Sequence, residues 1–192
     1  RIKYFCSNVK NIYERAKKIR YAVLINKALS MSKGEYISYA TDDNVYRPQR
    51  LEKMVNYLEC HPEINILYSG SRVVVVDKNG NEKKNQRYRV AKSKICFAPC
   101  KVDHCSIMHR ADILPIIYKK WGSYWDEDPQ YYFIGDARFF WRLNHFWCFY
   151  PINEVLDNNY MTDISLHVQK NSNKRNPLMA ILPKQKTCRS LL

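Results

Sequence analysis

The positions of apolar residues along the chain alternate between a helical and a strand-like period. Apolar residues at steps of four, three and four predict a helix over residues 11–33, which Gly34 ends. A run of β-type residues predicts a buried strand at Glu35–Thr41, and Pro48 marks the start of the next helix. The same reasoning predicts strands at Ile2–Phe5, Ile64–Asp77, Lys83–Val90 and Ser106–His109, helices at Ala111–Lys120 and Asp136–Phe146, and extended chain as far as Val155.

This order of elements predicts the class of fold. Strand–helix–strand–helix, followed by a second half rich in hairpins, indicates an α/β fold whose parallel sheet has an antiparallel extension. At 192 residues, with 46% hydrophobic and 14% aromatic residues, the chain suits one packed domain rather than a disordered chain. From about residue 168 the sequence is polar, basic and contains proline, so we expect residues 166–192 to form a mobile tail or lid.

Two adjacent carboxylates, Asp42 and Asp43, come directly after the predicted Glu35–Thr41 strand. The carboxyl end of a strand in an open α/β sheet is where ligands bind. Two carboxylates at that place repel each other unless a cation lies between them, and hard oxygen ligands suit Mg²⁺ or Mn²⁺. The alternative is that Asp-Asp-Asn is only a turn, because these residues favour turns and caps.

A third carboxylate, Asp136, follows Gly135 and precedes an amphipathic helix. Aspartate is among the best N-cap residues, so a capping role is the simpler interpretation. The functional alternative is a general base, held at the edge of a pocket by the helix behind it.

The net charge of +14 is distributed unevenly. Residues 1–34 contain nine Lys and Arg and one acid, and residues 167–192 contain six and no acid. Such a balance indicates an anionic partner, which could be nucleic acid, an acidic membrane surface or a phosphorylated small molecule. Arg15 and Arg20 either solvate a helix face or bind a diphosphate, since guanidinium pairs bidentately with phosphate oxygens.

The seven cysteines indicate reduced thiols in a cytoplasmic protein, because their number is odd and most lie in apolar stretches. Neither a signal peptide nor an apolar run of membrane-spanning length is recognisable. Zinc ligation is an unfavourable interpretation of the five Cys and His residues between 96 and 109, because an extended chain spaces them too far apart to surround one ion. His104 and His109 then belong to the core or its rim. Trp125 is either a core residue or a platform for a sugar ring.

Taken together, these motifs resemble those of the inverting glycosyltransferases of family 2, which have the GT-A fold. Within the family, the chain is most similar to the spore-coat polysaccharide glycosyltransferases of spore-forming bacteria. The resemblance covers about residues 1–165 and rests on these motifs: Glu14-Arg15, Arg20-Tyr21-Ala22, Gly34-Glu-Tyr-Ile37, Tyr39-Ala-Thr-Asp-Asp-Asn44, Asp103-His-Cys-Ser106, Gly122-Ser-Tyr-Trp-Asp-Glu127 and Gly135-Asp-Ala-Arg-Phe-Phe-Trp-Arg142.

The resemblance implies a role for several residues. Asp42 and Asp43 would bind Mn²⁺ or Mg²⁺ and the nucleotide-sugar, with Asp43 as the more direct metal ligand. Arg15 and Arg20 would contact the UDP- or dTDP-linked donor. Asp136 would be the catalytic base. The acceptor side, for a saccharide or another hydroxyl compound, would include Asp103, His104 and Trp125.

The resemblance also implies a missing part. Members of the family begin with a strand–helix–strand unit that forms the nucleoside pocket, and nothing in this sequence corresponds to that unit. We therefore expect an N-terminally truncated GT-A domain with a Rossmann-like mixed sheet.

Two other functions compete with this interpretation. A nucleic-acid-binding module is compatible with the charge and with fifteen tyrosines available for stacking, but the basic residues gather at the two ends without regular aromatic spacing. A nucleotidyltransferase acting on sugar phosphates could also use a carboxylate pair. It normally needs a glycine-rich phosphate loop near its start, which is not seen here. We expect no nucleic-acid partner.

Overall fold

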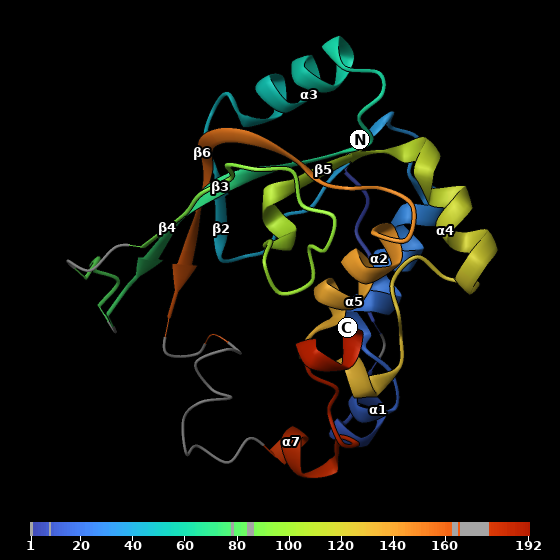
Figure 1. Cartoon of the computed structure of the whole chain (residues 1–192). Coiled ribbons are helices and arrows are strands. Elements are labelled where there is room, and N and C mark those ends of the chain that lie inside the picture. Colours follow the sequence, from blue (N-terminus) through green and yellow to red (C-terminus); the bar gives the residue numbers. More distant parts are fainter. Residues whose placement is uncertain (1, 8, 78, 84–86, 163–164, 166–176) are drawn as a thin grey trace.

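The computed structural model describes residues 2–7, 9–77, 79–83, 87–162, 165 and 177–192. One curled sheet runs through the domain, with helices on both of its faces (Figure 1). Its strands lie in the order β1 (Tyr36–Ser38), β5 (Ile107–Arg110), β3 (Ile66–Val75), β6 (Tyr150–Met161) and β2 (Asn44–Tyr46), and β4 (Arg87–Arg89) pairs with β3.

The mixed α/β fold predicted from the sequence is confirmed, although the sheet is more antiparallel than we predicted. Among the described strand pairs, only β3 and β6 run parallel. The register of that pair shifts around Gly70. A Cβ atom on Gly70 would lie 2.7 Å from the carbonyl oxygen of Arg89 and 3.2 Å from that of Glu154, so glycine lets the neighbouring strands approach.

Helices cover the sheet at α2 (Arg20–Met31), α3 (Arg50–Cys60), α4 (Leu114–Trp121) and α5 (Gly135–Leu143). Two short helices, α1 (Ile12–Lys17) and α7 (Pro177–Ile181), lie side by side below them (Figure 1). The described residues also include the 3₁₀ turns η1 (His104–Ser106), η2 (Ala111–Ile113), η3 (Pro129–Tyr131) and η4 (Cys188–Leu191). None of these helices is both long and apolar enough to cross a membrane.

Two predictions about the first 33 residues are wrong. The single helix predicted over 11–33 is divided into α1 and α2, because the backbone of Lys18 is extended. The N–H of Ile19 donates to the carbonyl of Glu127 at 3.0 Å instead of continuing the helix. The strand predicted at Ile2–Phe5 does not form in the described chain, where Ile2 and Tyr4 are exposed and no strand of the sheet pairs with them.

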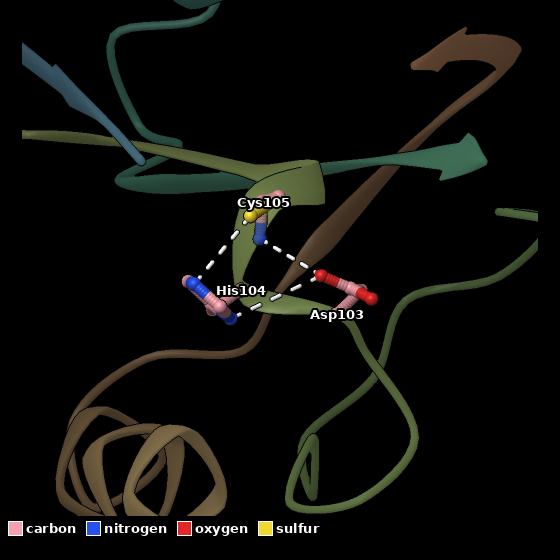
Figure 2. Close-up of side chains that lie close together, drawn as sticks. All are labelled: Asp103, His104 and Cys105. Atoms are coloured by element: carbon pink, nitrogen blue, oxygen red, sulfur yellow. Dashed lines mark hydrogen bonds and ion pairs between the residues drawn. The ribbon is translucent and has the colours of Figure 1, made fainter. Parts of the chain in front are cut away.

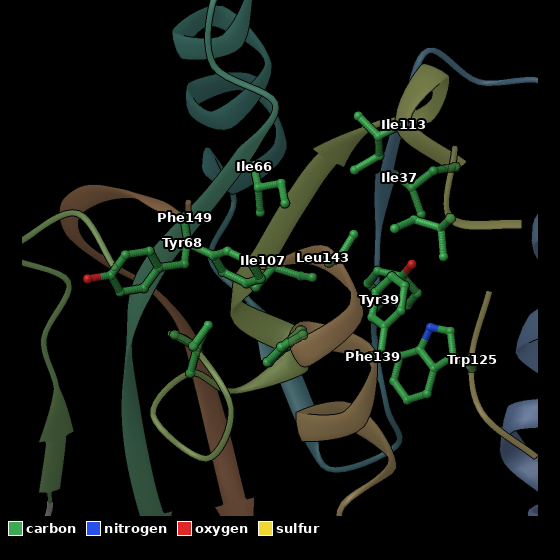
Figure 3. Close-up of a cluster of buried hydrophobic side chains, with 14 of the residues drawn as sticks. Ile37, Tyr39, Ile66, Tyr68, Ile107, Ile113, Trp125, Phe139, Leu143 and Phe149 are labelled. Carbon is green, nitrogen blue, oxygen red and sulfur yellow. The ribbon is translucent and has the colours of Figure 1, made fainter. Parts of the chain in front are cut away.

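The core has one large apolar cluster on each face of the sheet. Successive residues of β3 point to opposite faces, so Ile66 joins the cluster against α2 and α5, whereas Leu67 joins the cluster under α3. Figure 3 shows the first cluster, in which Phe139 of α5 lies against Trp125 and Tyr39. This cluster fixes α5 relative to the sheet.

A buried ion pair joins α3 to the sheet. Arg50 and Asp157 are both fully buried, and their charged atoms lie 3.1 Å apart. The Arg50 guanidinium also donates to Ser69 at 2.8 Å and to the Cys105 carbonyl at 2.7 Å. Burial raises the pKa of Asp157 to about 7, although Arg50 opposes the shift.

Replacing Arg50 with methionine is expected to destabilise the domain by about 3–5 kcal/mol, because it leaves a buried carboxyl without its partner. The pKa of Asp157 is higher in the folded protein than in the unfolded one. Its contribution to the free energy of unfolding is therefore full below about pH 4 and is lost as the pH rises through 7. Because Arg50 lowers the pKa of Asp157, its removal raises that pKa further, and the loss of stability then continues to a higher pH than in the unmodified protein. The destabilisation should therefore be larger at pH 8 than at pH 5. Urea unfolding at both pH values measures it. Lys53→Met, a change on the same helix, breaks the exposed ion pair with Glu154 of β6 and should cost less than about 1 kcal/mol.

The prediction of reduced cysteines is wrong for four of the seven. Disulfides join Cys96 to Cys148 and Cys100 to Cys188. The first follows from backbone pairing, because Ile95 and Phe149 exchange hydrogen bonds of 2.9 and 2.8 Å and bring the next residues together. Cys6, Cys60 and Cys105 are free.

The C-terminal segment, residues 177–192, is attached to the domain by the second disulfide and by apolar contacts. Leu178 and Leu191 are buried, and the main-chain N–H of Lys186 donates to the carbonyl of Gln130 at 2.8 Å. Residues 166–176 of the predicted tail lie outside the described residues. The division of the chain into a domain of residues 1–165 and a mobile lid stays a prediction.

Candidate active site

A cavity of about 700 Å³ opens at the ends of the sheet strands, beside the first turn of α5. Its walls come from α2, the turn after β1, η1 with the residue before it, the loop before α5, and the end of β6. Six of the predicted site residues line it: Asp42, Asp43, Asp103, His104, Trp125 and Asp136. Residues far apart in the sequence therefore meet at one place.

The carboxylate pair lies in the turn between β1 and β2. Asp42 is exposed, and Asp43 is half-buried. The Thr41 hydroxyl is within hydrogen-bonding distance of both the Asp43 carboxylate and the Asn44 side chain, and the N–H of Tyr160 donates to the Asp43 carbonyl at 2.7 Å. The backbone at Asp42 and Asp43 therefore forms a turn, as the alternative interpretation of this motif predicts. The same fixed turn presents both carboxylates to the cavity.

Opposite this turn, Asp103 and His104 lie before and at the start of η1. The Asp103 carboxylate forms an ion pair with Arg89 of β4 and accepts a hydrogen bond of 3.0 Å from the N–H of Cys105. Asn159 of β6 lies between the two walls, with its Nδ2 3.3 Å from both Asp103 and Asn44. These contacts connect the acidic turn to the acceptor side predicted from the sequence.

Figure 2 shows Asp103, His104 and Cys105 close together, with the His104 nitrogens 4.0 Å from Asp103 and 3.4 Å from Cys105. Such a trio could bind a borderline cation. Two features oppose this: burial raises the pKa of the Cys105 thiol to about 12, and Asp103 is already paired with Arg89. The other Cys and His residues considered for zinc lie elsewhere: Cys96 and Cys100 are in disulfides, and His109 contacts Tyr39 in the core.

Asp136 lies in the first turn of α5, one residue after Gly135. The capping interpretation is wrong, because the N-cap residue of α5 is Ile134. The Asp136 carboxylate instead accepts a hydrogen bond of 2.7 Å from the N–H of the adjacent Ala137. Burial raises the pKa of Asp136, whereas the charge of nearby His104 lowers it. A carboxylate with increased proton affinity at a cavity wall suits a general base.

Trp125, Arg15 and Arg20 lie differently from the other predicted site residues. The Trp125 side chain is 1% exposed and stacks on Phe139 with ring centroids 4.9 Å apart, so it belongs to the core and forms the cavity floor. Arg15 and Arg20 are exposed and do not line the cavity in the described chain. Their contact with a donor, and that of Trp125 with a sugar, stay predictions.

Comparison with known sequences decides the family. The sequence pattern described as "Glycosyl transferase family 2" matches residues 2–168. The chain belongs to glycosyl transferase family 2. This assignment confirms the expected GT-A type of fold.

Two curated relatives of this family 2 chain are informative. It is 48% identical over 149 residues to "Protein CgeD" of Bacillus subtilis (strain 168), which covers 78% of this chain and 35% of that protein. It is 34% identical over 93 residues to "Uncharacterized glycosyltransferase MJ1057" of Methanocaldococcus jannaschii, covering 46% of this chain and 31% of the relative. The chain thus spans about a third of the length of each.

Solved structures also resemble the family 2 chain. TarS 1–349 of S. aureus superposes with a TM-score of 0.46 at 12% identity, covering 72% of this chain and 40% of TarS. The structure titled as TarS 1–349 in complex with UDP-GlcNAc gives 0.46 at 13% identity, covering 81% of this chain and 43% of TarS.

The charge of the cavity suits a divalent cation. Four aspartates line it, accompanied by one histidine and, among the described lining residues, by neither Lys nor Arg. This is the reverse of the chain as a whole, whose net charge is +14. Carboxylate oxygens from Asp42 and Asp43 are the donors that Mg²⁺ or Mn²⁺ prefers, so the residues present fit such an ion.

The sequence did not reveal several residues of this family 2 cavity. Tyr21 and Ile25 belong to the segment for which the sequence predicts an amphipathic helix with a basic polar face, and Asn159 and Tyr160 belong to the last strand. Their patterns carry no chemical signal because they reach the cavity only through pairing of β6 with β2 and β3 and through packing of α2 beside α5.

Proposed function

We propose that this domain transfers a sugar from a UDP- or dTDP-linked donor to a hydroxyl acceptor, with inversion at the anomeric carbon. The observation that carries the proposal is the grouping of Asp42 and Asp43 with Asp136 in one cavity. The first two are the expected ligands of a divalent cation. The third has the raised pKa and the placement that a general base needs.

In this proposal Asp42 and Asp43 hold Mn²⁺ or Mg²⁺, with Asp43 the principal ligand. The bound ion would supply neutralising charge to the donor diphosphate. Asp136 accepts the proton of the acceptor hydroxyl while its oxygen attacks the anomeric carbon. The bond from that carbon to the phosphate oxygen breaks on the opposite face, and the nucleoside diphosphate leaves.

The remaining predicted residues have supporting roles. Asp103 and His104 form the acceptor side, and Arg15 and Arg20 contact the donor once it is bound. A role in spore-coat or other cell-surface polysaccharide synthesis is part of the proposal, and so is the particular closeness to spore-coat enzymes. The cytoplasmic location stays a prediction, and the two disulfides count against it.

The test is nucleotide binding and release by the full-length protein that contains this domain. With a panel of UDP- and dTDP-sugars we expect Mn²⁺ or Mg²⁺ to support release of UDP or dTDP, and EDTA to abolish it. Calorimetric titration with UDP should give a Kd that is lower with the ion than without it by about tenfold or more, because one cation contact with a diphosphate contributes at least ~1.4 kcal/mol.

A control variant distinguishes an effect of the proposed metal site from an effect of the overall charge of the protein. Asp43→Ala should remove the effect of the ion on UDP binding, whereas Asp112→Ala, an exposed aspartate outside the cavity, should leave it unchanged. UDP affinity that is insensitive to EDTA would refute the metal-dependent site. Tight, salt-sensitive binding of single-stranded nucleic acid in place of UDP would favour the alternative of a nucleic-acid module.

A further inference from the structure

Tyr21, on the first turn of α2, contacts the segment that leads into α5 just before Asp136. Its hydroxyl donates a hydrogen bond of 2.9 Å to the carbonyl of Tyr132, and its ring lines the cavity. A Cβ atom on Gly135 would lie 2.3 Å from the Tyr21 oxygen and 3.0 Å from its Cζ. The phenol therefore rests directly on the main chain of the residue before Asp136, at a place where a side chain would not fit.

The helix that carries Tyr21 is itself firmly held. Ala22 is fully buried, and the side-chain amide of Asn26 bonds to both the N–H and the carbonyl of Trp125, at 2.7 and 3.0 Å. The Tyr21 ring meets Trp125 and Tyr132 edge-on, with centroids 6.2 Å apart in each pair. A side chain on such a support can fix the position of what it touches.

The chemistry of the hydroxyl agrees with this role. Burial raises the pKa of Tyr21, and the negative charge of Asp136 raises it further. The hydroxyl is thus protonated in the working pH range and stays a hydrogen-bond donor to Tyr132.

We propose that Tyr21 is a positioning residue for Asp136: by holding Tyr132 and Gly135, it sets where the carboxylate lies in the cavity. This inference rests on the proposed function, in which Asp136 is the general base. Tyr21 itself transfers no proton. Its effect reaches the reaction through the loop of residues 132–135.

The first test is Tyr21→Phe in the full-length protein. We expect kcat to fall by about ten- to a hundredfold, as a misplaced base would cause, while the Kd for UDP with Mn²⁺ changes less than about twofold. The acid limb of the kcat–pH profile should also shift, because the pKa of Asp136 depends on its position relative to His104 and Asp103.

Tyr68→Phe is the matched control. The Tyr68 hydroxyl also donates to a main-chain carbonyl, that of Ser93 at 2.6 Å, but Tyr68 does not line the cavity. It should lower stability as much as Tyr21→Phe does and leave kcat and its pH profile unchanged. A Tyr21→Phe variant with unaltered kcat, or with losses equal to those of Tyr68→Phe, would overturn the proposal.

A second variant tests the contact with Gly135. Gly135→Ala should reduce kcat by pushing the loop away from the Tyr21 oxygen. Removing that oxygen leaves contacts of 3.0 and 3.1 Å, so Tyr21→Phe combined with Gly135→Ala should be no slower than Gly135→Ala alone. Multiplicative losses would mean that the two residues act separately, and the proposal would be wrong.

The outcome for Asp136 separates this inference from the proposed function. If Asp136→Asn is inactive but Tyr21→Phe is fully active, the base assignment stands and the positioning role fails. If Asp136→Asn is active, the proposed base itself fails, whatever Tyr21→Phe does.

Discussion

Asp136→Asn is expected to lower kcat by about 10²–10⁴-fold, the usual contribution of a general base. Asparagine keeps the shape of the side chain and can still accept the hydrogen bond from Ala137, so the fold and the Kd for UDP should change little. Nucleotide release under saturating donor measures the effect. Loss of activity without loss of binding would locate the defect in the chemical step.

The pH dependence of nucleotide release by the unmodified protein provides a second test of the role of Asp136. Asp136 must be ionised to accept a proton, and burial raises its pKa above the ordinary carboxylate value. Activity should therefore fall as the pH decreases through this raised pKa, earlier than it would for an exposed aspartate. The remaining activity of Asp136→Asn should lack this limb.

Asp128→Asn is the control for the loop as a whole. Asp128 caps η3 by accepting from the N–H of Gln130 at 2.9 Å, and it lies outside the cavity lining. Asparagine preserves the cap, so kcat should stay within about twofold, as for surface changes with no named structural effect. If Asp136→Asn behaved like Asp128→Asn, another group would have to be the base.

Replacing both Cys100 and Cys188 with serine is expected to lower the free energy of unfolding by about 2–5 kcal/mol. The bridge closes a loop with a sequence separation of 88, and long loops restrict the unfolded chain most. It is also the covalent attachment of the C-terminal segment, whose Leu191 packs against Ile134 and Ala137 beside Asp136. Guanidinium unfolding with and without reductant measures the change.

Two comparisons make this result specific. Reductant should reproduce the Cys100→Ser/Cys188→Ser effect in the unmodified protein and add a further loss through Cys96–Cys148. Cys60→Ser removes an exposed free thiol and should have almost no effect. An unfolding curve of the double serine variant that matches the unmodified protein would show that this bridge does not contribute to stability.

The sequence predicted well those features that depend on neighbouring residues. The short apolar run before Asp42 and Asp43 is a strand, and the carboxylates follow it in a turn at the cavity. The helix after Gly135 is also present, with Asp136 in its first turn. Local periodicity and turn chemistry determine both features, so one sequence suffices to find them.

The features that the sequence did not predict depend on distant partners. The helix over 11–33 breaks because the partner of the Ile19 N–H is Glu127, on another loop. Cys96 pairs with Cys148 only because β-type bonds join Ile95 to Phe149. Tyr21 enters the site by packing on Gly135. No spacing within a single segment contains this information.

Because the cavity is acidic and the protein as a whole is basic, the divalent ion and the sugar nucleotide should bind in a fixed order. The overall field of a +14 chain attracts an anionic sugar nucleotide from solution, but four aspartates line the cavity it must enter. A bare diphosphate would meet like charge at close range, whereas its chelate with a divalent ion carries less negative charge. We therefore expect a compulsory sequence in which the ion arrives first or together with the donor, so that the free concentration of the ion governs how often a productive encounter occurs.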